Sequence, residues 1–372
     1  MPRAKKPRPG GKGKGTRRPP RQQPETNRYE AVVVAGLETI ARRELAVHLE
    51  RRVTLHRIPA DAEPGVFRFD STGGLRALLR MKTIQAIYHV RWYDVPRPKA
   101  LLGDAHFRQL VADIAMIRAI HPPEAFQTLH ISAAGEDTAV MQRLREALAA
   151  ATGLQPDMEE GDLLLRLRRP RQGVGWEVLT RISPRPLATR PWRVCNMEGA
   201  LNATVAHAMA LMTDPQPHDV FLNLACGSGS ILIERLAAAP ARQAIGCDTS
   251  PEALDCARAN VAAARFGDQR VALQPWDMCD LPLETASVDA LCADLPFGHL
   301  VGSHAENLEL YPATLKEAAR VARPGALFAL ITHEVRLTES LLAESGQWAT
   351  VAVQRIALGG LNPRIFVLQR LP

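Results

Sequence analysis

The stretch "FLNLACGSGSILIE", residues 221–234, decides the fold of the second half of the chain. A short apolar strand runs into a turn that contains Gly227 and Gly229, and a segment expected to be helical follows. Glycines in such a turn let the backbone pass close to a ligand and direct amide groups at it from a helix N-terminus. A dinucleotide-binding turn would carry a third glycine where this chain has Leu232, which counts against a nicotinamide cofactor.

Outward from this stretch, the same alternation of strand and helix extends from residue 200 to residue 372. The strands are continuous apolar runs, as expected when helices cover both faces of a sheet. The pattern therefore predicts an α/β domain with a parallel, doubly wound sheet. Its last two strands, "TVAVQRIALGG" and "RIFVLQRL", are joined by a short turn, which predicts a C-terminal antiparallel hairpin.

Acidic residues stand at the ends of three later strands of this predicted sheet. Asp248 could accept both hydroxyls of a ribose, and Asp277 could accept the amine of an adenine that lies against Trp276 or Met278. The next strand ends in "DLPF", which begins at Asp294. Because the carboxyl ends of parallel strands meet at one edge, we expect a shared pocket with the glycine turn. Singly, Asp248 could be a helix cap and Asp294 a turn former.

Together these segments resemble the class I S-adenosylmethionine-dependent methyltransferases. The segment from Asn223 to Gly229 matches their first motif, and "DLPF" matches their amino-methyltransferase motif, usually written N/D-P-P-Y/F. The variant D-x-P-F-G is similar to that of THUMP-domain methyltransferases, which methylate guanosine N2 in tRNA. The resemblance implies a Rossmann-like methyltransferase sheet preceded by α+β ferredoxin-like and THUMP domains.

The resemblance also implies site residues. Those expected to bind S-adenosylmethionine are Asn223, Ala225, Cys226, Gly227, Gly229, Asp248, Thr249, Asp277 and Met278; those expected to be catalytic are Asp294, Leu295, Pro296 and Phe297. Asp294 and the carbonyl of Leu295 would accept the two N–H bonds of the guanine amine, and Phe297 would stack on the base. Two departures from the family pattern are Asn223, where an acid is usual, and Leu295, where the commoner form has proline.

The first half of the chain carries shorter strands and helices, typical of one or two small α+β units. The predicted organisation is a disordered basic tail over 1–27, a ferredoxin-like domain over 28–96, a THUMP-like RNA-binding domain over 97–182, a linker over 183–199 and the methyltransferase domain over 200–372. In the linker, Arg190 and Arg193 flank Trp192, and we predict that these three residues contact RNA.

Charge and cysteine content restrict the class of protein further. The net charge is +7, but residues 1–24 contain nine Lys or Arg and no acid, so this tail could gather RNA.

The six cysteines form no C-x-x-C pair, and we expect buried thiols in a reducing compartment instead of disulfides. The histidines lack metal-ligand spacing, which predicts no metal. The chain has no long apolar run, so we expect no membrane contact. We also expect a cytoplasmic location and a monomer.

The leading hypothesis is transfer of a methyl group to the exocyclic N2 of a guanosine in tRNA, in the acceptor stem. Three alternatives remain open at this point: a ribosomal-RNA guanine-N2 enzyme, an RNA adenine-N6 enzyme, and a non-catalytic RNA-binding protein with a retained cofactor pocket. The intact "DLPF" segment disfavours the non-catalytic alternative, whereas Asn223 mildly favours it.

Overall fold

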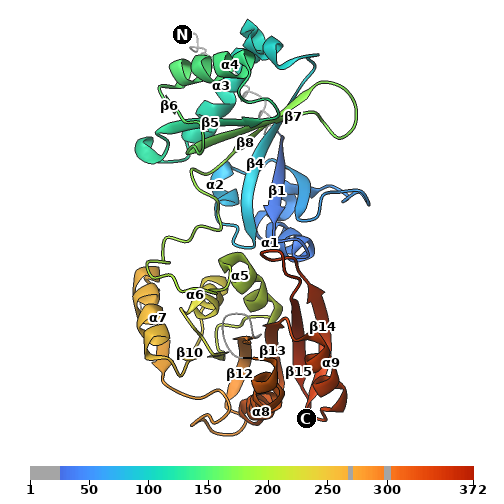
Figure 1. Cartoon of the computed structure of the whole chain (residues 1–372), viewed down its shortest axis with the longest axis vertical. Helices are drawn as coiled ribbons and strands as arrows, with labels where there is room; N and C mark the ends of the chain where they lie inside the picture. Colours follow the sequence, from blue (N-terminus) through green and yellow to red (C-terminus); the bar gives the residue numbers. More distant parts are fainter. Residues whose placement is uncertain (1–25, 267–270, 297–302) are drawn as a thin grey trace, which may run out of the picture.

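The computed structural model describes residues 26–266, 271–296 and 303–372, which form two units (Figure 1). Residues 182–202 join them, and we call these residues the connecting segment. Most of the predicted tail lies outside these ranges, and so does Phe297. No helix within the described ranges is long and apolar enough to cross a membrane.

The first unit, blue to green in Figure 1, is a sheet of eight strands with helices. The strands are β1 (Asn27–Val33), β2 (Val53–Leu55), β3 (Val66–Ser71), β4 (Ile84–Tyr93), β5 (Thr128–Ala133), β6 (Gln155–Pro156), β7 (Leu163–Arg168) and β8 (Trp176–Arg181). The helices are α1 (Glu38–Leu49), α2 (Leu75–Leu78), α3 (Asp104–Arg118) and α4 (Ala139–Thr152). The strand order is β2-β3-β1-β4-β8-β7-β5-β6.

The boundary that we predicted at residue 97 does not divide this sheet. Strand β4 pairs antiparallel with β1 on one side and with β8 on the other. One hydrophobic cluster contains Phe69, from before the expected boundary, and Leu165, from after it. The two segments expected as separate domains therefore share a sheet and a core, because the ten-residue strand β4 offers both of its edges for pairing.

The second unit, olive green to red in Figure 1, is a sheet of seven strands with the order β11-β10-β9-β12-β13-β15-β14. Its strands are β9 (Val220–Leu224), β10 (Gln243–Cys247), β11 (Val271–Gln274), β12 (Val288–Asp294), β13 (Ala322–Thr332), β14 (Trp348–Arg355) and β15 (Arg364–Arg370). Its helices are α5 (Ala203–Met212), α6 (Ser230–Ala238), α7 (Pro251–Ala264), α8 (His304–Val321) and α9 (Val335–Glu344).

This sheet confirms the predicted doubly wound α/β fold. Strands β9 to β13 are parallel, whereas β14 and β15 form the predicted antiparallel hairpin. Every residue of β9 is buried, since Phe221 faces a core shared with α5 and α6 while Leu222 faces a core shared with α8. Strand order reverses between β9 and β12, and ligands of such sheets bind beside that point.

Buried charges join the two units at the connecting segment. Arg190 Nε donates to Glu234 Oε1 on α6 at 2.7 Å, and a second guanidinium nitrogen donates to the carbonyl of Lys82 at 2.7 Å. His207 Nδ1 on α5 lies 3.0 Å from Glu234 Oε2, and its Nε2 lies 3.8 Å from Glu44 Oε1 on α1. Two carboxylates, one guanidinium and one imidazole therefore lie together where little solvent reaches.

This arrangement contradicts the predicted RNA contacts of Arg190 and Trp192. Both side chains are buried, and Trp192 Nε1 also donates to Glu234 Oε1. Arg193 stacks on Trp192 and donates to the carbonyl of Leu201 at 2.8 Å. A cation next to an aromatic ring is a pattern of nucleic-acid surfaces, but it also suits a packed domain junction, where these three residues lie.

The expectation of reduced cysteines is also corrected. Cys195, in the connecting segment, forms a disulfide with Cys256 on α7, and their Cα atoms are 5.4 Å apart. The two residues are separated by 61 positions in the sequence, and only the fold brings them together. The free cysteines are Cys226, Cys247 and Cys292, all buried, and the half-buried Cys279.

Candidate functional site

A cavity of about 610 Å³ opens at the carboxyl ends of β9, β10 and β12. Its walls are Met197, Glu198, Gly199, Ala200 and Leu201 from the connecting segment; Ala225, Cys226, Gly227, Ser228, Ser230 and Ile231 after β9; Asp248, Thr249, Ser250 and Ala253 after β10; Trp276, Asp277 and Met278 after β11; Asp294, Leu295 and Pro296 at β12; and Leu310 on α8. We call residues 197–201 the junction wall.

The glycine turn after β9 exposes its backbone to this cavity. Gly227 and Gly229 have φ values of +51° and +81°, and Ala225 is also left-handed at +44°. A Cβ built on Gly227 would meet none of the described atoms within 4 Å, whereas one on Gly229 would lie 3.3 Å from the Cβ of Ala257. Gly227 thus leaves a backbone cradle open to a ligand, and Gly229 allows close packing of α7.

Asp248 organises this turn. One carboxylate oxygen accepts the Gly227 N–H at 2.8 Å, and the other accepts the Ser250 N–H at 3.0 Å. The helix cap that we considered for Asp248 belongs to Ser250, whose hydroxyl accepts the Ala253 N–H at 3.1 Å. The carboxylate is part of the cavity wall and retains lone pairs that can accept ligand hydroxyls.

The segment after β11 contributes an aromatic ring, a thioether and a carboxylate. Trp276 is half-buried, Met278 is buried, and Asp277 is exposed, with one carboxylate oxygen accepting the Cys279 N–H at 2.9 Å. All three residues that we predicted around an adenine ring therefore line the same cavity.

Asp294 is the last residue of β12 and lines the same cavity. Desolvation raises the pKa of Asp294 to about 7, because the carboxyl group has lost most of its water. The neighbouring Leu295 is buried in the core, and its N–H donates to the carbonyl of Ile331 at 3.1 Å. This leucine fills apolar space in place of the more usual proline, so it anchors the segment by packing.

A series of hydrogen bonds fixes the backbone at Pro296, two residues after Asp294. The buried Tyr311 on α8 donates its hydroxyl proton to the carbonyl of Pro296 at 2.7 Å. The same hydroxyl lies 2.7 Å from Thr332 Oγ1, which accepts the Glu334 N–H at 2.9 Å. Because the single hydroxyl proton of Tyr311 goes to Pro296, Thr332 must donate to Tyr311. The direction of each hydrogen bond in this series is therefore determined. Sequence reasoning missed Tyr311, because its role depends on a contact between α8 and β13.

Asn223 and Gly229 are the predicted binding residues that do not form the cavity wall. Asn223 is buried, and its amide nitrogen lies 3.1 Å from the carbonyl of Leu224 and 3.4 Å from that of Cys292. Its Oδ1 has no hydrogen-bond partner among the described residues. Asn223 therefore lies near the end of β9, where its amide nitrogen contacts two backbone carbonyls.

The junction wall was not predicted as part of the site. The sequence analysis placed most of these residues in a linker over 183–199, and nothing in the periodicity of that segment points to a cavity. Leu310 was missed for a similar reason, since its position depends on how α8 packs. Phe297 falls outside the described residues, so its predicted stacking role stays a prediction.

Comparison with known proteins agrees with this geometry. Residues 190–364 match the family of RMKL-like methyltransferase domains. The structure is similar to the crystal structure of TrmN from Thermus thermophilus, with a TM-score of 0.70, 22% identity, and coverage of 93% of this chain and 100% of that one. The second unit therefore has the class I methyltransferase fold, and the likeness of fold extends to the first unit.

Curated relatives match part of the chain, and two of them are guanine-N2 methyltransferases of different RNAs. A mouse tRNA (guanine(6)-N(2))-methyltransferase THUMP3 is 35% identical over 182 residues, which are 46% of this chain and 36% of the relative. A bovine U6 snRNA (guanine-N(2))-methyltransferase THUMPD2 is 32% identical over 151 residues, 40% of this chain and 28% of the relative. The chain thus spans about a third of the length of these relatives.

Proposed function

We propose that the chain transfers a methyl group from S-adenosylmethionine to the exocyclic N2 of a guanosine in tRNA, in the acceptor stem. One observation carries the proposal: the glycine turn, Asp248, Asp277 and Asp294 all line a single cavity. The likeness to guanine-N2 methyltransferases supports the choice of base. A THUMP-like role for the first unit, a cytoplasmic location and a monomeric state stay predictions.

The cavity fits this cofactor. The open cradle at Gly227 and the first N–H groups of α6 suit the carboxylate of an amino acid. Asp248 has free acceptor capacity for a ribose, and Asp277 can accept an adenine amine beside Trp276 and Met278. When bound, the cofactor supplies a methyl group already activated on a sulfonium.

The chain itself contributes mainly orientation and charge. The guanine amine is a poor nucleophile, because its lone pair is delocalised into the ring. If Asp294 and the Leu295 carbonyl accept its two N–H bonds, the lone pair points away from them and toward the methyl carbon. The carboxylate then stabilises the positive charge that develops on nitrogen. With its pKa near 7, Asp294 can also accept the proton that the methylated nitrogen must lose.

Tyr311 and Thr332 would hold the Pro296 carbonyl still while the base enters. A guanine paired in a stem cannot reach this cavity, so the base must be extruded or taken from an unpaired position. Phe297 remains our candidate for stacking on the extruded ring, a contact worth about 1–3 kcal/mol in comparable proteins.

Nucleoside mass spectrometry tests the proposal. The full chain is incubated with S-adenosylmethionine and unmodified tRNA, and the digest is searched for N2-methylguanosine, with Asp294→Asn as the control. A product absent from the control supports the proposal. N6-methyladenosine would overturn the choice of base. Product only on ribosomal or U6 RNA would overturn the choice of substrate, and no product despite cofactor binding would favour the non-catalytic alternative.

A further inference from the structure

The junction wall borders the proposed cofactor cavity, although most of its side chains have little cover. Residues 194–200 are exposed or half-buried, whereas Trp192 before them and Leu201 after them are buried. The segment is therefore anchored by a buried residue on each side. Between them, a disulfide and two hydrogen bonds hold Cys195, which lies two residues before the junction wall.

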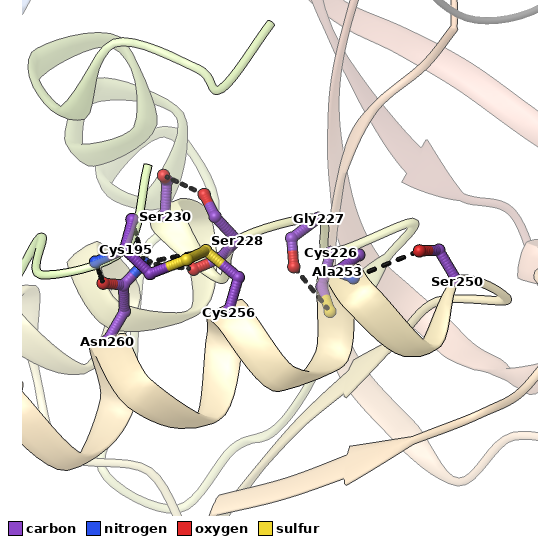
Figure 2. Close-up of a disulfide and its surroundings, with 9 residues drawn as sticks. All are labelled: Cys195, Cys226, Gly227, Ser228, Ser230, Ser250, Ala253, Cys256 and Asn260. Carbon is purple, nitrogen blue, oxygen red and sulfur yellow. Dashed lines mark hydrogen bonds between the residues drawn. A yellow bond between two sulfur atoms is a disulfide. The ribbon is translucent and has the colours of Figure 1, made fainter. Parts of the chain in front are cut away.

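Two kinds of bond fasten Cys195 to helix α7, as Figure 2 shows. The first is the disulfide to Cys256. The second is the side chain of Asn260, one turn further along α7, which accepts the Cys195 N–H and donates to the Cys195 carbonyl, both at 2.9 Å. The same amide group donates to the carbonyl of Ser228 at 3.0 Å. One buried asparagine therefore connects the bridge to the glycine turn.

The start of helix α7 also borders the cavity. Ala253 on the helix lines the cavity, as do Asp248 and Ser250 just before it, and Cys256 lies one turn beyond Ala253. A covalent bond at Cys256 thus fixes the junction wall relative to the residues proposed to hold the ribose. Breaking the bond leaves the wall attached to α7 through the hydrogen bonds of Asn260.

We propose that Cys195 and Cys256 form a reversible thiol–disulfide site that fixes the junction wall, with a small disulfide such as oxidised glutathione as the oxidant. The effect on cofactor rests on the proposed function. Cys195 is half-buried and Cys256 is buried, so Cys195 is the sulfur accessible to the reagent.

The exchange has two balanced steps. The thiolate of Cys195 attacks one sulfur of the small disulfide, which forms a mixed disulfide and releases one thiol. The thiolate of Cys256 then attacks the Cys195 sulfur and releases the second thiol. The protein loses two electrons and two protons, and the small disulfide is reduced to two thiols. The Cα separation of 5.4 Å is within the range that a disulfide spans without backbone movement.

The test uses the full chain, equilibrated with oxidised glutathione or with a phosphine reductant. Differential alkylation and mass spectrometry should show Cys195 and Cys256 joined only under oxidising conditions. Hydrogen exchange of residues 194–200 should be faster in the reduced protein. Binding of S-adenosylhomocysteine should weaken on the order of three- to tenfold on reduction, because the wall is no longer preorganised.

The variants separate this site from the other thiols. A Cys195→Ser, Cys256→Ser chain should lose the dependence on reductant, whereas Cys279→Ser, which removes a half-buried free thiol, should keep it. Absence of the bridge after oxidation, or equal exchange rates in both redox states, would overturn the proposal. Lack of S-adenosylhomocysteine binding in both states would instead overturn the proposed function, and hydrogen exchange would still decide the role of the bridge.

Discussion

The hydroxyl of Tyr311 donates to the carbonyl oxygen of Pro296 at 2.7 Å, joining helix α8 to the segment that we propose holds the target base. Tyr311 is fully buried, and its side chain is not part of the cavity wall. Its hydrogen bond fixes the position of the backbone near Asp294. Tyr311 is therefore proposed as a positioning residue.

Replacing Tyr311 with phenylalanine should lower kcat about tenfold, the usual net effect of one lost hydrogen bond. The dissociation constant of S-adenosylhomocysteine should change little, because the cofactor residues stay in place. Steady-state kinetics and a binding titration separate the two effects. Tyr93→Phe is the matched control, since the buried Tyr93 hydroxyl has no partner among the described residues. Equal kcat values for the two variants would contradict the positioning role.

Asp294→Asn should lower kcat by a factor on the order of 10²–10³, because charge stabilisation at the amine is lost. In the natural chain kcat/KM should rise with pH and level off above about pH 7, as Asp294 loses its proton. A rate that does not change between pH 6 and pH 8 would contradict the assigned role of the carboxylate.

The same substitution should stabilise the fold at high pH. The folded protein holds the Asp294 proton up to about pH 7, whereas the unfolded chain releases it near the ordinary value of 3.8. The free energy of unfolding therefore falls as pH rises through this window. At pH 8, Asp294→Asn should be more stable by roughly 1–4 kcal/mol in urea unfolding, with no gain at pH 3. The exposed Asp61→Asn should show no such pH dependence.

Glu234→Gln should destabilise the protein on the order of 3–5 kcal/mol at pH 7, because Arg190 and His207 lose their buried carboxylate. Burial raises the pKa of Glu234, but the hydrogen bond with His207 and the charge of Arg190 outweigh it and hold that pKa at about 2, below its usual 4.5. Its contribution is therefore complete above pH 4.5 and is lost as pH falls from 4.5 toward 2. Urea unfolding across this range should show the variant and the natural chain converging in acid.

Arg185→Ala is the control for that network, since Arg185 is an exposed arginine in the same connecting segment. Its effect on unfolding should stay within about 0.5 kcal/mol. If Glu234→Gln were as stable as the natural chain while RNA binding weakened, the buried network would not be the main role of Arg190, and our original RNA prediction would return.

Gly227→Ala should weaken binding of S-adenosylhomocysteine about tenfold or more, because the added methyl group projects into the open cradle. The positive φ alone should cost about 1–2 kcal/mol of stability. Gly359→Ala is matched, with a φ of +58° and similarly open surroundings in the β14–β15 turn, away from the cavity. A titration in which both variants bind equally well would show that the cradle is not used.

The sequence by itself determined the doubly wound sheet and most of the cavity. Continuous apolar strands alternating with helices leave few arrangements, and parallel strands must bring their carboxyl ends to one edge. Asp248, Asp277 and Asp294 could therefore be placed in one cavity from their positions at strand ends alone.

Only the tertiary structure decided the features that depend on contacts between distant segments. Cys195 meets Cys256, and Arg190 meets Glu234, through packing of the connecting segment against α6 and α7, which no local pattern records. The hydrogen bond from Tyr311 to Pro296 depends likewise on how α8 docks. Periodicity reports which face of an element is buried, because burial is a local property of spacing; which partner it is buried against is set by the whole fold.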